Sequence, residues 1–109
     1  MSTSGPRVLR LCAAADLASG AARRFDVDGV GICLVHCDDG FHAVEDTCSH
    51  EDYSLAEGEV DAGRAEIECW KHGSLFSLVT GEPLTLPATR PVAVYEVAVD
   101  GDDVSVVLP

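Results

Sequence analysis

Two short clusters in this sequence combine a thiol with an imidazole. The first is Cys48-Ser49-His50 and the second is Cys69-Trp70-Lys71-His72, with eighteen residues between them. Thiolate and imidazole are ligands of zinc and of iron in proteins. Each cluster follows a strand-like segment and opens into a turn, so two neighbouring hairpins would bring two sulfur and two nitrogen ligands together. The pattern predicts one metal centre that takes one cysteine and one histidine from each cluster.

Two kinds of metal centre compete for this ligand set. Structural zinc sites usually pair Cys-x2–4-Cys with His-x3–5-His, whereas each cluster here supplies one ligand of each kind. A binuclear iron–sulfur centre explains the mixture better, because two cysteines can hold one iron and two histidines the other. The alternative is an interaction module in which the same four residues bind a structural zinc ion.

The two clusters, with Gly73-Ser74, Thr80-Gly81-Glu82-Pro83 and the segment 86–91, resemble the motifs of Rieske [2Fe–2S] ferredoxins. The resemblance covers essentially the whole chain and is greatest to small bacterial ferredoxins that serve ring-hydroxylating oxygenases. It implies an all-β fold of stacked antiparallel sheets with a cluster-binding subdomain at the tip. It also implies a carrier of single electrons from a reductase to an acceptor such as a non-haem iron oxygenase, and not an enzyme in its own right. Similar sequences beside iron–sulfur assembly proteins leave a redox-sensing or assembly-associated role as a further alternative.

The resemblance also implies which residues bind the one [2Fe–2S] cluster of the chain. Cys48 and Cys69 would bind the buried iron, and His50 and His72 would bind the outer iron. A third loop, Leu86-Pro87-Ala88, would cover the cluster, with Pro87 at its centre.

Four residues of the second cluster region are expected to form the surroundings of the metal centre. Ser74 would donate its hydroxyl hydrogen to a bridging sulfide, and Gly73 would supply the backbone conformation beside it. Trp70 would act as an apolar contact for a partner protein, and Lys71 as a guiding charge. The equally weighted alternative is that Trp70 packs the loop and Lys71 is only solvated.

The reduction potential is expected at the low end of the Rieske range, which runs from about −150 to +300 mV. High-potential relatives carry a disulfide, and the corresponding positions here are Tyr53 and Lys71. Those relatives also carry a tyrosine where this chain has Phe76, which has no hydroxyl to donate. Nine acids in residues 45–68, against Arg64 alone, oppose the addition of an electron.

Charge and composition narrow the possible partners. Seven Lys and Arg against nineteen Asp and Glu give a net charge of −12 over 109 residues. Nucleic acids and anionic membranes are therefore excluded as expected partners, whereas the acids of 45–68 would steer a basic reductase or oxygenase. Without a long apolar stretch or a signal peptide, the chain is expected to be cytoplasmic. It is also expected to be a monomer, with a flexible N-terminus at residues 1–6 and a single domain at residues 7–109.

Short strands are predicted along most of the chain. Asp39-Gly40 and Asp100-Gly101 are predicted to form tight hairpin turns, Thr80–Pro83 another reversal, and Asp61–Arg64 a further turn. One helical turn is expected near Cys12–Leu17. Alternation puts Cys33 and Cys37 on one face of their strand, and with Cys12 they are expected in the core, whereas His36 and His42 are expected to be ordinary strand residues. The predicted strands are 7–11, 22–27, 30–37, 41–45, 65–69, 75–78, 92–99 and 104–108.

Overall fold

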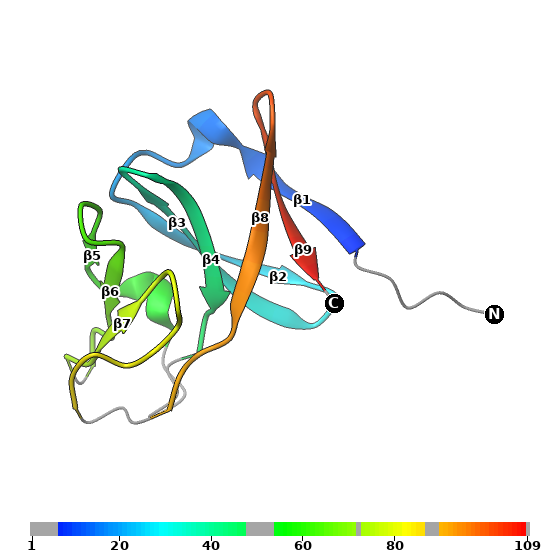
Figure 1. Cartoon of the computed structure of the whole chain (residues 1–109). Helices are drawn as coiled ribbons and strands as arrows, with labels where there is room; N and C mark the ends of the chain where they lie inside the picture. The colour runs from blue at the N-terminus through cyan, green and yellow to red at the C-terminus, as the bar shows by residue number, and fades with distance from the viewer. Residues whose placement is uncertain (1–6, 48–53, 72, 87–89, 109) are drawn as a thin grey trace.

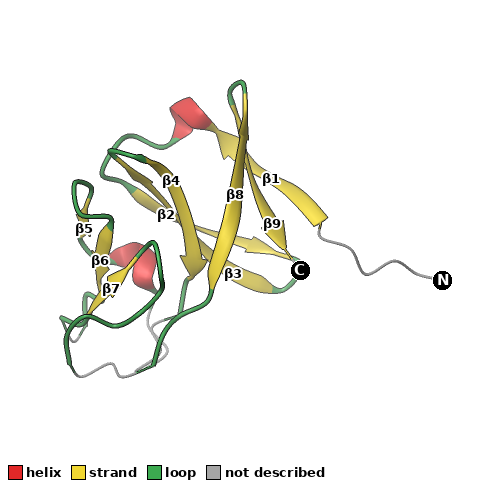
Figure 2. Ribbon diagram, in the orientation of Figure 1, coloured by secondary structure: helices red, strands yellow, loops and turns green. Residues whose placement is uncertain are grey.

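The structure is a computed structural model that describes residues 7–47, 54–71, 73–86 and 90–108. These residues form two antiparallel sheets and two short 3-10 helices (Figures 1 and 2). No helix in the described ranges is long and apolar enough to cross a membrane. The elements are β1 (Arg7–Ala13), η1 (Ala14–Asp16), β2 (Ala22–Val27), β3 (Val30–Cys37), β4 (Gly40–Glu45), η2 (Leu55–Glu57), β5 (Val60–Asp61), β6 (Glu66–Glu68), β7 (Leu75–Ser77), β8 (Val94–Asp100) and β9 (Asp103–Leu108).

The larger sheet has the strand order β1-β9-β8-β4-β3-β2 and curls so that its two halves face each other (Figure 1). Sequential hairpins join β2 to β3, β3 to β4 and β8 to β9. β4 and β8 join the two halves of the sheet and pair through Ala43 with Tyr95 and through Val44 with Val94. The smaller sheet, β5-β6-β7, lies at one end of the molecule. The predicted all-β class is therefore confirmed.

Residues in the hairpin turns adopt positive φ values. Gly40 and Gly101 have φ values of 128° and 61°, which confirms the turns predicted beside them. Asp28 and Gly29, which were not among the predicted turn residues, form the loop between β2 and β3 with φ values of 52° and 78°. Two successive residues at positive φ match the type I′ turn that suits the twist of a hairpin.

Strand β3 contributes side chains to two separate cores. Cys33, Val35 and Cys37 point to the core that the small sheet covers. Ile32 and Leu34 point to the core inside the curled large sheet. A strand buried on both faces carries a continuous apolar run, as this one does. The predicted shared face of Cys33 and Cys37 is confirmed, as is the burial of Cys12 in the second core.

Four details of the predicted elements need correction. Cys12 lies in β1, and only Ala14–Asp16 form a 3-10 helix, so the expected helical turn is shorter. The strand predicted from residue 65 begins at Glu66, because Ala65 adopts a φ of 54° in the turn before it. The strand predicted at 92–99 begins at Val94. Neither β5 nor η2 was predicted, since two or three residues carry no readable periodicity. The predicted flexible segment 1–6 lies outside the described residues.

Candidate metal centre

The second sequence cluster lies in the hairpin between β6 and β7. Glu68 pairs with Leu75, and the loop between them runs from Cys69 to Ser74. The Cys69 N–H donates to the Ser74 carbonyl at 2.8 Å, and the Gly73 N–H donates to the Cys69 carbonyl at 2.9 Å. Gly73 has a φ of 75°, a conformation that favours glycine. The loop is thus closed by its own backbone around the first residue of the cluster.

This loop separates inward from outward side chains. Cys69 and Ser74 are both fully buried, at 0% exposure. Trp70 and Lys71 are exposed, and the Lys71 Nζ lies 5.8 Å from the centre of the Trp70 ring. A thiol and a hydroxyl therefore face the interior while two larger side chains face solvent. His72, the other predicted ligand of this cluster, lies outside the described residues.

The first cluster lies in the segment that follows β4. Thr47 and Ser54 form an antiparallel bridge, so the chain leaves and re-enters the described part at neighbouring points. The predicted ligands Cys48 and His50 fall between them, outside the described residues, as does Tyr53. Leu55, directly after this segment, shares one core cluster with Cys69 and Phe76. The described residues that flank the first cluster are therefore at the same end of the molecule as the second hairpin.

Asp46 fixes both ends of that segment. Its side chain is fully buried; one carboxylate oxygen accepts the Ala56 N–H at 3.0 Å, and the other accepts an Arg24 N–H at 2.8 Å. Its carbonyl accepts the Leu55 N–H at 2.6 Å, and its own N–H donates to the Gly31 carbonyl at 3.0 Å. Sequence reasoning counted Asp46 only among the acids of 45–68. The sequence did offer one signal, because Asp46 directly follows an apolar strand and lies two residues before the predicted ligand Cys48.

A third segment runs alongside β7 toward the predicted covering loop. Phe76 bridges Pro83 after a reversal at Gly81, which confirms the turn predicted there. The Leu84 N–H donates to the Leu75 carbonyl at 2.6 Å, and the Thr85 hydroxyl oxygen accepts the Leu75 N–H at 2.9 Å. The segment reaches residue 86 with its backbone tied to the second hairpin. Pro87 lies outside the described residues.

The described donors fit an iron–sulfur cluster. Cys69 carries a buried thiol with no disulfide partner among the described cysteines, at the end of a strand and beside a buried hydroxyl. Its backbone polar groups are already hydrogen bonded within the loop, which leaves the sulfur to bind a soft metal ion. The described part of this loop thus offers one buried sulfur ligand for a metal centre, at the end of a strand in an all-β scaffold.

Comparison with known proteins identifies the family. A family model described as the Rieske [2Fe-2S] domain matches residues 7–96, and the chain belongs to this family. The 3-phenylpropionate/cinnamic acid dioxygenase ferredoxin subunit of Escherichia coli K12 is 41% identical over 98 residues, which cover 90% of this chain and 91% of that protein.

Solved structures agree with this assignment. The ferredoxin of carbazole 1,9a-dioxygenase from Nocardioides aromaticivorans IC177 superposes with a TM-score of 0.87 at 36% identity, covering 91% of this chain and 95% of that one. A ferredoxin solved in a complex of reduced oxygenase and oxidised ferredoxin in carbazole 1,9a-dioxygenase gives a TM-score of 0.85 at 40% identity, covering 91% of each chain.

These findings confirm the predicted Rieske fold and the [2Fe–2S] cofactor. They favour the iron–sulfur interpretation over the structural zinc site. The relatives are ferredoxin subunits, so the chain is an electron carrier and not itself an enzyme. The four individual ligands remain predictions.

Proposed function

We propose that this chain carries single electrons from a reductase to the terminal oxygenase of an aromatic-ring dioxygenase system. The observation that supports this most directly is 41% identity with a dioxygenase ferredoxin subunit over nine-tenths of both chains. A neighbour of similar identity is a ferredoxin solved in complex with its oxygenase.

The proposed cluster ligands are Cys48 and Cys69 on one iron and His50 and His72 on the other. When bound, the cluster accepts and releases one electron, and two neutral histidine ligands make that reduction easier than four thiolates would. Ser74 is buried in the same loop as Cys69. Its hydroxyl is therefore the one that we propose to donate a hydrogen bond to the cluster.

The proposed docking surface for the oxygenase surrounds the second hairpin. Trp70, Leu84 and Leu86 are exposed at 49, 48 and 77%, an unusual set of large apolar side chains on a strongly acidic protein. Leu84 is tied by its N–H to β7, and Trp70 directly follows Cys69. A partner that covers these side chains approaches the predicted cluster closely, as electron transfer requires.

Charge supports an oriented approach. Five acids lie on or between η2, β5 and β6, next to the second hairpin, whereas two of the seven basic residues lie on β1 of the large sheet. Figure 1 shows the small sheet and β1 at opposite ends of the molecule. A basic partner is therefore attracted to the end that carries the predicted cluster. The acids are Glu57, Glu59, Asp61, Glu66 and Glu68, and the basic residues on β1 are Arg7 and Arg10.

Two finer expectations belong to this proposal. Residues 7–109 form one functional domain, and the protein works in the cytoplasm, where a reductase can draw electrons from soluble nucleotides. Fractionation of the native host with an antibody against this chain tests the location.

Replacement of the ferredoxin in a dioxygenase assay tests the function. The oxygenase and reductase of the E. coli 3-phenylpropionate dioxygenase are mixed with this protein in place of their own ferredoxin, and product formation is followed. Turnover with wild-type protein and none with His72→Ala supports the proposal, provided that His72→Ala has lost its iron and sulfide. An intact cluster in His72→Ala contradicts the ligand assignment. A wild-type protein that holds its cluster and reduces no aromatic-ring oxygenase contradicts the proposed function.

A further inference from the structure

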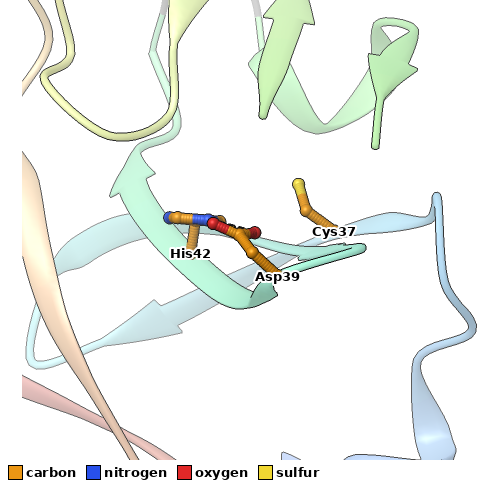
Figure 3. Close-up of side chains that lie close together, drawn as sticks. All are labelled: Cys37, Asp39 and His42. Atoms are coloured by element: carbon orange, nitrogen blue, oxygen red, sulfur yellow. Dashed lines mark hydrogen bonds and ion pairs between the residues drawn. The ribbon is translucent and has the colours of Figure 1, made fainter. Parts of the chain in front are cut away.

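We propose that the β3–β4 turn carries a second metal site, formed by Cys37, Asp39 and His42, that binds a zinc ion. The ligand atoms of these three side chains all lie within 4.8 Å of one another. Figure 3 shows the Cys37 sulfur, the Asp39 carboxylate and the His42 ring on the same side of the turn. None of the three belongs to the predicted cluster ligands.

The hairpin register brings these side chains together. Cys37 pairs with Gly40 and Val35 pairs with His42, so Cys37 and His42 lie on the same face of the hairpin as diagonal neighbours. Asp39 lies in the two-residue loop between them, and its carboxylate oxygen is 2.9 Å from the His42 Nε2. Three potential ligands are thus assembled by one tight turn.

Local charge favours a dication at this position. Burial and the nearby carboxylates of Asp39, Asp38 and Asp61 raise the pKa of Cys37 to about 11. The negative potential that opposes a thiolate attracts a divalent cation, and a bound cation reverses the effect on the thiol. One of these carboxylates also meets a basic residue, since the Arg64 Nε lies 3.9 Å from an Asp61 oxygen.

The donor set is one that zinc accepts. Sulfur, imidazole nitrogen and carboxylate oxygen are its three protein ligand types, and three protein ligands leave a fourth position for water. Binding converts the Cys37 thiol to a thiolate and releases its proton to solvent, because only the thiolate is a zinc ligand. The Cys37 thiolate and the Asp39 carboxylate then carry two negative charges, which balance the two positive charges of the zinc ion.

This site is separate from the predicted cluster. The turn at residues 62–65 precedes β6 and meets the β3–β4 turn, since the Asp38 N–H donates to the Ala62 carbonyl at 3.0 Å. Cys69 follows the opposite end of β6. A zinc ion at Cys37 would hold the junction of the two sheets at the end of β6 away from Cys69.

Zinc titration of the cluster-loaded protein tests the proposal. Binding is measured by competition with a chromophoric chelator, and iron and sulfide are assayed before and after, so that exchange into the cluster is detected. We expect one zinc ion per chain, at unchanged cluster content, and at least a tenfold loss of affinity in Cys37→Ser and in His42→Gln. With cadmium in place of zinc, the near-ultraviolet thiolate absorption is expected in the wild type and not in Cys37→Ser.

The controls distinguish this site from general thiol or histidine binding. Cys12→Ser and His36→Gln change one cysteine and one histidine elsewhere in the large sheet and are expected to bind zinc as the wild type does. Asp39→Asn changes an exposed side chain and provides a variant that folds if Cys37→Ser does not. Equal affinity in the wild type, Cys37→Ser and Asp39→Asn, or no binding to the wild type, overturns the proposal.

Discussion

The carboxylate of Asp46 is fully buried, and it is shared between the Arg24 side chain on β2 and the Ala56 backbone on η2. Arg24 itself is 45% exposed and also contacts the exposed Asp26. A carboxylate removed from water is tolerated only where charged or hydrogen-bonding groups replace its hydration. The pair therefore joins the edge strand of the large sheet to both ends of the segment that carries two predicted ligands.

Asp46→Ala is expected to destabilise both the fold and the cluster. The part-buried Ala56 N–H loses its acceptor, which costs about 1–3 kcal/mol of unfolding free energy. Urea unfolding followed by far-ultraviolet circular dichroism measures that loss, and bleaching of the visible absorption measures release of the cluster. The matched control is Asp26→Ala, which removes the exposed partner of the same arginine and is expected to change stability by less than about 0.5 kcal/mol. Equal effects of the two substitutions would contradict the anchoring role of Asp46.

Ser74→Ala is expected to keep the cluster and lower its reduction potential. A hydrogen bond from the hydroxyl stabilises the reduced, more negative cluster more than the oxidised one. A differential of about 1.4 kcal/mol corresponds to about 59 mV for a one-electron couple, so a fall of roughly 30–100 mV is expected. Protein-film voltammetry measures the potential. Ser105→Ala on β9 is the control, and an unchanged potential in Ser74→Ala would exclude the hydroxyl as a donor to the cluster.

Gly58→Ala is expected to loosen the contact between η2 and β6. A Cβ atom at Gly58 would lie 1.6 Å from the Glu68 carbonyl oxygen, which belongs to the backbone just before Cys69. The backbone must therefore shift, at a cost on the order of 2–4 kcal/mol, in the range of severe single substitutions. Gly63→Ala is the control, since its Cβ would meet only side-chain oxygens at 3.6 and 3.7 Å. Thermal unfolding of the two variants checks the difference, and similar melting temperatures would show that the close approach is not rigid.

Removing acidic charge beside the second hairpin is expected to slow electron transfer. Glu57 and Glu59 are exposed, and replacing both by glutamine is expected to reduce the rate to a basic oxygenase about two- to tenfold at low salt. Near 1 M salt, where the screening length falls to about 3 Å, the difference is expected to vanish. Stopped-flow oxidation of the reduced protein gives the rates. Asp100→Asn with Asp102→Asn, at the β8–β9 turn, is the control of equal charge, and equal slowing by both pairs would exclude a directed approach.

The sequence determined the strands with the longest apolar runs most clearly. The bounds of β2 and β3 were predicted to the residue, because the alternation of 22–27 stops at Asp28-Gly29 and a β-branched apolar run begins after it. Elements held by tertiary contacts were not predictable: η2 and β5 are too short to carry a period, and Ala65 adopts its positive φ only where the chain must turn into β6. The metal ligands could be predicted from the residue types and spacing of the two Cys–His clusters. The burial of Asp46 could not be predicted, because it depends on Arg24, which lies 22 residues earlier in the chain.

The double burial of β3 has a mechanical consequence for the molecule. One row of its side chains completes the compartment beneath the small sheet, and the other row completes the compartment inside the curled sheet. A void opened at Leu34 would therefore also disturb the strand that carries Val35 and Cys37. We expect the two compartments to unfold together, because this one strand belongs to both.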